Sequence, residues 1–243
     1  MTKKPPKHSE RKKRESSAYR LKRSWGAGRT DAPTVRIRPE RFLIVIEGTR
    51  TEPAYFEGFR KRVTNSYGGN YITIEIHGAG FNTVSLFERA RLLSQSDIAG
   101  FTQVWIVYDK DSFPAQDFNA VADLCNAVSR GGTRFRAAWT NEAFELWFLL
   151  HYAYVESGLS RNAYGPKLSS HLQSDGKGSY RKNRADMYEI LEGRLGNAVA
   201  NAERLEEVNA VRTSFECNPG TTVHHLVKEL LPYIRSSAEN DGE

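Results

Sequence analysis

Two short stretches of the chain are apolar at nearly every position, which is typical of strands buried on both faces of a parallel sheet. They span residues 41–46 and 103–108. Residues 71–77 instead alternate between apolar and polar side chains, which predicts a half-exposed strand near an edge of the sheet. A fourth strand is expected over residues 134–139.

Between these strands, apolar positions recur with the 3.6-residue period of helices that bury one face. Such helices are expected to begin near Thr51, Thr83 and Pro114, and a further helix over residues 143–151 is apolar nearly all round. Strands that alternate with helices predict an α/β fold with a doubly wound, mostly parallel sheet.

Beyond Tyr154 the pattern changes. Residues 158–184 are rich in Ser, Gly, Lys and Arg and show no convincing period, so they are expected to form a basic loop. A helical C-terminal extension is expected after it, with helices over residues 185–195, 198–208 and 221–231.

The charge of the chain is divided unevenly. Residues 1–38 contain 13 Lys and Arg against 3 acidic residues, a net charge of +10, whereas the rest contains 22 bases and 26 acids. Such an arm stays extended and is attracted to polyanions. It is either an arm that faces nucleic acid or the ribosome, or a solubilising tail without a specific partner. The expected parts are a basic, disordered arm (1–38), an α/β core (39–155), and a basic loop with the helical extension of the same domain (156–235).

Composition excludes several classes of protein. No run of about 18 apolar residues is present, so no transmembrane helix is expected. No apolar segment follows the basic N-terminus, so no secretory signal is expected. Cys125 and Cys217 cannot form a disulfide framework or a four-cysteine zinc site. A cytoplasmic protein is therefore expected.

Acidic residues follow both buried-type strands, Glu47 after the first and Asp109 and Asp111 after the other. Ligands of doubly wound sheets collect beyond the carboxyl ends of the strands. Positions i and i+2 of an extended segment face the same side, so both aspartates are expected to converge while Lys110 turns away. Converging carboxylates repel unless a cation neutralises them, and oxygen ligands select Mg²⁺ or Mn²⁺. The alternative is that the aspartates cap the next helix and Glu47 pairs with an arginine.

Glu145 lies inside an apolar helix, and a buried carboxylate needs a partner. A metal ion, a catalytic lysine or a structural arginine would each provide one, and a core ion pair without a catalytic role is the alternative. Glu142 lies one turn earlier on the same face.

Other polar residues carry weaker signals. A basic segment is expected either to track a nucleic-acid backbone or to be a mobile loop; its basic residues include Lys177, Arg181, Lys182 and Arg184. His224 and His225 are adjacent on an expected helix, so their rings are expected to point apart and not to share a metal. His151 ends an apolar helix, where a packing role is expected.

Several segments resemble, in order, motifs of the RloB-like family. They are residues 44–56, which include Glu47-Gly48 and Thr51-Glu52-Pro53, residues 104–111, residues 141–151, Tyr180 with Lys182, and residues 218–227. The sequence Asn-Glu-Ala-Phe-Glu-Leu-Trp-Phe-Leu-Leu-His over 141–151 is the most distinctive. The resemblance covers about 41–231 and leaves out the arm.

The resemblance implies a Toprim-like fold and a place in bacterial restriction, modification and phage defence. Toprim proteins, which include topoisomerases, primases and nucleases, use a glutamate after the first strand and an Asp-x-Asp pair after a later one. By position, Glu47 would be the general acid/base or a metal ligand, and Asp109 and Asp111 would be the metal pair.

Together, these signals predict a Mg²⁺- or Mn²⁺-dependent phosphodiesterase that cleaves DNA or RNA in phage defence. The expected catalytic residues are Glu47, Asp109, Asp111 and Glu145, supported by Glu52, Asn141 and Glu142. The alternative is a non-catalytic module that binds nucleic acid or a protein partner and works with an ATPase or a restriction–modification complex.

Overall fold

The computed structural model describes most of the chain from residue 40 onward. The described ranges are 40–67, 72–78, 83–110, 114–129 and 132–234. The basic arm and Asp111 lie outside these ranges, so the expectations placed on them stay predictions. Among the helices that the structure describes, none is long and apolar enough to cross a membrane.

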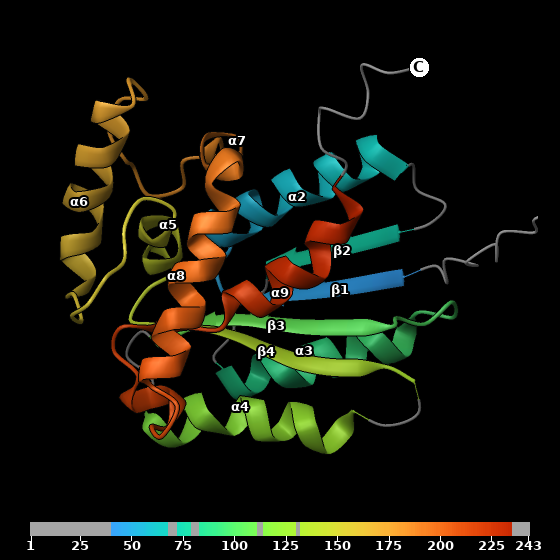
Figure 1. Cartoon of the computed structure of the whole chain (residues 1–243). Coiled ribbons are helices and arrows are strands. Elements are labelled where there is room, and N and C mark those ends of the chain that lie inside the picture. Colours follow the sequence, from blue (N-terminus) through green and yellow to red (C-terminus); the bar gives the residue numbers. More distant parts are fainter. Residues whose placement is uncertain (1–39, 68–71, 79–82, 111–113, 130–131, 235–243) are drawn as a thin grey trace, which may run out of the picture. The chain divides into compact units, whose positions relative to one another are not determined.

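A five-stranded sheet runs through the described residues in the order β2-β1-β3-β4-β5 (Figure 1). The strands are β1 Glu40–Ile46, β2 Ile72–Gly78, β3 Gln103–Asp109, β4 Arg134–Asn141 and β5 Gly220–Thr221. The first four are parallel, and β5 pairs antiparallel with β4. The predicted doubly wound α/β fold is therefore confirmed, including the position of β2 at an edge.

Helices connect the strands and form the C-terminal extension. They are α2 Thr51–Tyr67, α3 Thr83–Ser96, α4 Ala115–Val128, α5 Glu145–Leu150, α6 Arg161–Ser174, α7 Met187–Leu191, α8 Leu195–Val208 and α9 Val223–Leu230, with short 3₁₀ helices at η1 Glu192–Arg194, η2 Ser214–Glu216 and η3 Leu231–Tyr233. The extension is not separate from the sheet, because it supplies β5.

Both faces of the sheet are covered, as the unbroken apolar strands predicted. In β1, Phe42, Ile44 and Ile46 pack into one core, and Leu43 and Val45 pack into the other. The second core is completed by α3 and α4, whereas α2 and the helices from α5 onward complete the first (Figure 1). Each such side chain stabilises the fold by about 1.5–3 kcal/mol on burial, so these cores hold the strand ends in place.

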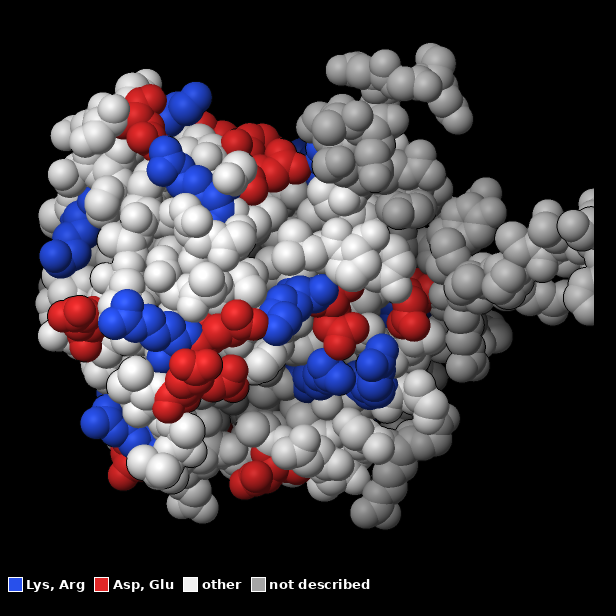
Figure 2. Space-filling view, viewed as in Figure 1, with Lys and Arg blue, Asp and Glu red and all other residues white. Residues whose placement is uncertain are grey.

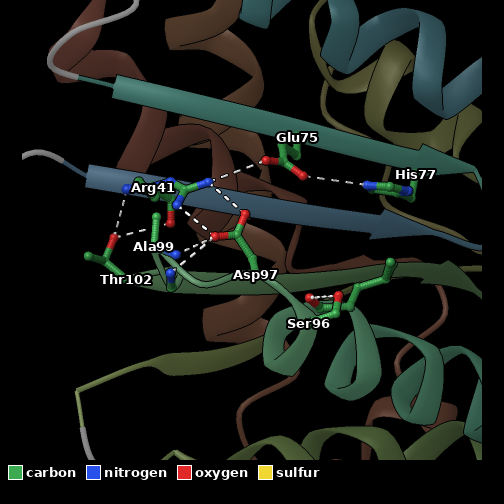
Figure 3. A network of polar contacts seen from close by, with 9 residues as sticks. Arg41, Glu75, His77, Ser96, Asp97, Ala99 and Thr102 are labelled. Atoms are coloured by element: carbon green, nitrogen blue, oxygen red, sulfur yellow. Dashed lines mark hydrogen bonds and ion pairs between the residues drawn. The ribbon is translucent and has the colours of Figure 1, made fainter.

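A polar network fixes the start of β1 (Figure 3). The Arg41 guanidinium donates to both carboxylate oxygens of Asp97 at 2.9 Å and lies 3.4 Å from Glu75 of β2. The backbone N–H of Arg41 donates to the hydroxyl of Thr102, and its C=O accepts from the Thr102 N–H. Paired oxygens on a guanidinium give a directional bond, so this network ties β1 to β2 and to the loop before β3.

The expectation that residues 158–184 form a loop is wrong for half of the segment, which contains α6. Tyr164, Leu168 and Leu172 recur every four residues on the buried side of this helix. Gly165 and Pro166 mask the pattern, because both residue types disfavour a helix interior, and Pro166 has no N–H to donate to the preceding turn. The basic loop is confined to residues 175–186.

Candidate functional site

Glu47 and Asp109 lie at the point between β1 and β3 where the order of the strands in the sheet reverses, the topological switch point. The strands β1 and β3 are neighbours, while the connections from them lead to opposite edges of the sheet. Ligands of doubly wound proteins bind at this switch point. The backbone N–H of Asp109 donates to Oε2 of Glu47 at 3.3 Å, and the N–H of Glu47 donates to the C=O of Val107 at 2.9 Å. Two predicted site residues are therefore held side by side by the sheet itself.

Arg161 is a member of this site that the sequence analysis did not identify. Its Nη2 lies 2.9 Å from Oδ2 of Asp109, whose residue is only 7% exposed. Arg161 is the first residue of α6, and its backbone N–H donates to Oε2 of Glu142 at 3.1 Å. Glu142 therefore satisfies a free N–H at the start of α6 and positions the helix so that its arginine reaches the carboxyl end of β3.

Glu52 lies against the turn after β1. A Cβ at Gly48 would lie 2.1 Å from Oε2 of Glu52, so a larger residue at position 48 would push the end of this side chain aside. Burial raises the pKa of the Glu52 carboxyl and nearby Glu145 adds to the effect, whereas Lys182 and Arg161 act in the opposite direction. The structure thus brings Glu52 and Glu145 together near two cationic side chains.

The carboxylate of Glu145 has a partner that is neither a metal ion nor a basic residue. The hydroxyl of Tyr180 donates to Oε1 of Glu145 at 2.9 Å. Burial, together with the charge of Glu145, raises the pKa of Tyr180, so the phenol keeps its proton and remains a donor. The expectation that Glu145 is buried inside its helix is wrong, because it is the first residue of α5 and only half-buried, and its carboxylate accepts from a tyrosine 35 residues further along the chain.

The side chains of Asn141 and Lys110 both contact Phe215. The Asn141 side chain is fully buried, and its Nδ2 donates to the C=O of Phe215 at 2.8 Å. The Lys110 ammonium lies over the ring of Phe215, 4.5 Å from its centroid. Lys110 thus lies against Phe215, while Asn141 holds the segment that leads into β5.

The four residues of the predicted nucleic-acid surface lie in the loop after α6, but they differ in their contacts. Lys177, Arg181 and Lys182 are exposed. The guanidinium of Arg184 bonds both carboxylate oxygens of Asp186 at 2.6 and 2.9 Å and donates to two backbone carbonyls. Arg184 thus stabilises the loop. Lys182 is the member of the four whose charge acts to lower the pKa of Glu52.

Charges on the face of α8 and α9 are mixed. Figure 2 shows Lys and Arg interspersed with Asp and Glu over this face. Lys228 pairs with Glu203 at 2.6 Å, and Arg136 of β4 pairs with Glu229 at 2.9 Å. Basic groups that are paired with acids in this way attract a phosphate backbone less strongly than unpaired ones.

The expectation that His224 and His225 point apart is wrong. Their ring centroids lie 4.1 Å apart, and both rings contact the carboxylate of Glu206 on α8. Adjacent helical positions differ by only 100° in direction, so a partner between them can bring both side chains together. Burial, and then the neighbouring His225, lowers the pKa of His224.

His151 has the packing role that was expected. It is fully buried, with Nδ1 2.9 Å from the C=O of Trp147 and Nε2 3.4 Å from the hydroxyl of Tyr55. The indole N–H of Trp147 donates to the same hydroxyl. Burial lowers the pKa of His151 to about 4, so the ring is neutral at pH 7.

Fold and site together define an α/β domain with acidic side chains gathered at the switch point of its sheet. The chain belongs to the RloB-like family, because the family model described as RloB-like protein matches residues 42–230. The fold is consistent with the Toprim-like arrangement that the sequence resemblance implied. No curated protein and no solved structure matches the chain significantly.

Proposed function

We propose that the chain is a Mg²⁺-dependent phosphodiesterase that cleaves DNA or RNA in bacterial phage defence. The observation that carries this proposal is the contact between Glu47 and Asp109 at the switch point. Arg161 pairs with Asp109 and also interacts with Glu52, which is near Glu145, so acidic and basic groups of the kind that phosphoryl transfer uses lie next to each other.

The donor set fits a hard cation, because Glu47 and Asp109 offer carboxylate oxygens and no sulfur or imidazole lies among them. These two residues, with Asp111 two positions further along the chain, would hold Mg²⁺. When bound, such an ion neutralises charge on phosphate oxygens and lowers the pKa of water.

Arg161 would orient the phosphate. Its side chain is 37% exposed although it is bonded to Asp109, so it can be reached from solvent. Arginine binds phosphate through two parallel N–H donors. Lys182 is exposed near Glu52 and would contact an adjacent phosphate, while Glu47 would transfer the proton.

A non-catalytic binding module is the second candidate. One observation favours it: the guanidinium of Arg161 lies 2.9 Å from the carboxylate of Asp109 and offsets its charge. In this case, the domain would bind nucleic acid or a partner, such as an ATPase or a subunit of a restriction–modification complex, and Mg²⁺ would not be needed.

An assay on the full chain separates the two candidates. Labelled duplex DNA, single-stranded DNA, RNA and tRNA are incubated with Mg²⁺, with Mn²⁺ or with chelator, and both cleavage and binding are measured. We expect cleavage only with the metal, and its loss in Glu47→Gln and Asp109→Asn but not in Asp123→Asn, a matched change at an exposed position of α4. Binding that ignores the metal, with no cleavage of any substrate, would establish the binding module instead.

A further inference from the structure

A second group of ligand-type side chains lies between α8 and α9. Glu206 is on α8, and His224 and His225 are in the first turn of α9. Nε2 of each histidine lies 3.0 Å from a different oxygen of the Glu206 carboxylate. Ligand-type atoms of all three residues lie within 4.8 Å of one another. One carboxylate thus faces two imidazoles at a single point.

We propose that Glu206, His224 and His225 bind one Zn²⁺ ion. Two histidines and one glutamate are a known zinc ligand set, with bonds of about 2.0–2.2 Å. Two ligands of a tetrahedral ion at such bond lengths lie roughly 3.4 Å apart. The two 3.0 Å contacts therefore need to widen by only a few tenths of an ångström. Imidazole nitrogen favours zinc over magnesium, which sets this site apart from the carboxylates at the switch point.

Burial gives the group one closed side. His224 is fully buried, and its Nδ1 has no hydrogen-bond partner among the described residues. Contact with Glu206 therefore satisfies only one nitrogen of this ring. The side chains of His225 and Glu206 are 40% and 47% exposed, so an ion can enter from solvent.

The surroundings leave room for a further ligand. A cavity of about 530 Å³ is lined by Glu206, His225 and Thr222, among others, and Glu206 also lines one of about 240 Å³. Three protein ligands leave the fourth tetrahedral position of zinc open. Water or a small anion in the larger cavity can fill that position.

An ion here would cross-link the two helices beside β5. The backbone N–H of Thr222, just before α9, donates to the C=O of Trp139 in β4. Zinc binding is therefore expected to stabilise the C-terminal extension where it joins the sheet. Without an ion, the three side chains would form only a hydrogen-bonded cluster.

A zinc titration of the full chain tests the proposal. The protein is dialysed against chelator and titrated with Zn²⁺ in competition with a chromophoric chelator, and melting temperature is recorded in parallel. The variants are Glu206→Gln and His225→Gln, and the matched control is Glu207→Gln, the exposed neighbour on α8. Thermal unfolding in the presence of chelator first establishes whether each variant is folded. If Glu206→Gln does not fold, His225→Gln decides the outcome, because its side chain is partly exposed.

We expect one equivalent of Zn²⁺ to bind the unaltered chain and Glu207→Gln and to raise their melting temperatures. Glu206→Gln and His225→Gln should bind at least about tenfold more weakly and show no such rise. Replacing Zn²⁺ by Co²⁺ should give the visible absorption of a tetrahedral ion. Absence of binding to the unaltered chain, or an affinity in the folded variants equal to that of the unaltered chain, would overturn the proposal.

Discussion

The guanidinium of Arg161 lies 2.9 Å from the carboxylate of Asp109, and the two residues are 52 positions apart in the sequence. This pair connects α6 to the carboxyl end of β3 at the switch point. It supplies a positive charge to a site that is otherwise rich in acids, and it makes the position of α6 part of the site.

The pair determines how the stability responds to loss of the Asp109 charge. Repulsion among carboxylates alone would make Asp109→Asn neutral or stabilising. Because the carboxylate is nearly buried and accepts a charge-assisted bond, we expect the substitution to lower the free energy of unfolding by about 1–3 kcal/mol in metal-free buffer. Urea unfolding of Asp109→Asn, Arg161→Gln and the double variant would give the coupling energy. A coupling of zero, or a gain in stability, would show that the pair contributes nothing.

Glu142 is expected to act through the first turn of α6. Its carboxylate accepts the backbone N–H of Arg161, so Glu142→Ala removes a cap and should cost about 1 kcal/mol. The same change should reduce cleavage, because Arg161 loses its fixed position. Glu156→Ala, at an exposed position of the preceding loop, is the control. If both variants unfold at the same denaturant concentration as the parent, the capping role is refuted.

His151 gives the protein a defined sensitivity to acid. Burial lowers its pKa from the ordinary 6.5 to about 4, so the unfolded chain binds the proton first as the pH falls. Above pH 6.5 the ring is neutral in both the folded and the unfolded chain, and the free energy of unfolding is not reduced. Between pH 6.5 and 4 this group lowers the free energy of unfolding by about 3 kcal/mol in all. Chemical unfolding of His151→Gln across this range should show a flatter dependence on pH. Equal slopes in His151→Gln and in the unaltered chain would contradict this account.

Deleting residues 1–38 should weaken nucleic-acid binding without abolishing cleavage. The arm carries a net charge of +10, and each phosphate that it neutralises adds about 0.9 to the slope of log affinity against log salt on duplex DNA. Binding isotherms at several salt concentrations would measure the slope. An unchanged slope would mean that the arm does not touch nucleic acid.

Long, strongly patterned elements could be predicted from the sequence because their physical signals are local. The apolar runs of β1 and β3 predicted the core of the parallel sheet, and the alternation of β2 predicted an edge strand. The acidic residues at the ends of β1 and β3 predicted Glu47 and Asp109 as candidate site residues. Elements with weak local signals were missed. Pro166 masked α6, and β5, with two residues, is too short to alternate.

Contacts between distant segments could not be predicted from one sequence. Arg161 reaches Asp109 only because α6 packs against α5, and Tyr180, in the loop after α6, meets Glu145 of α5 for the same reason. His224 and His225 converge because Glu206 comes from another helix. In each case the partner is set by tertiary packing, for which spacing along the chain carries no signal.

The initial rate of cleavage as a function of Mg²⁺ concentration, in the full chain and in Asp109→Asn, tests the central claim most directly. The account requires a rate that rises to saturation with Mg²⁺ in the unaltered chain and falls by at least about 100-fold in the folded variant. Asp123→Asn should match the unaltered chain. Cleavage that persists in Asp109→Asn, or that proceeds equally well in chelator, would contradict a metal-dependent site at the switch point.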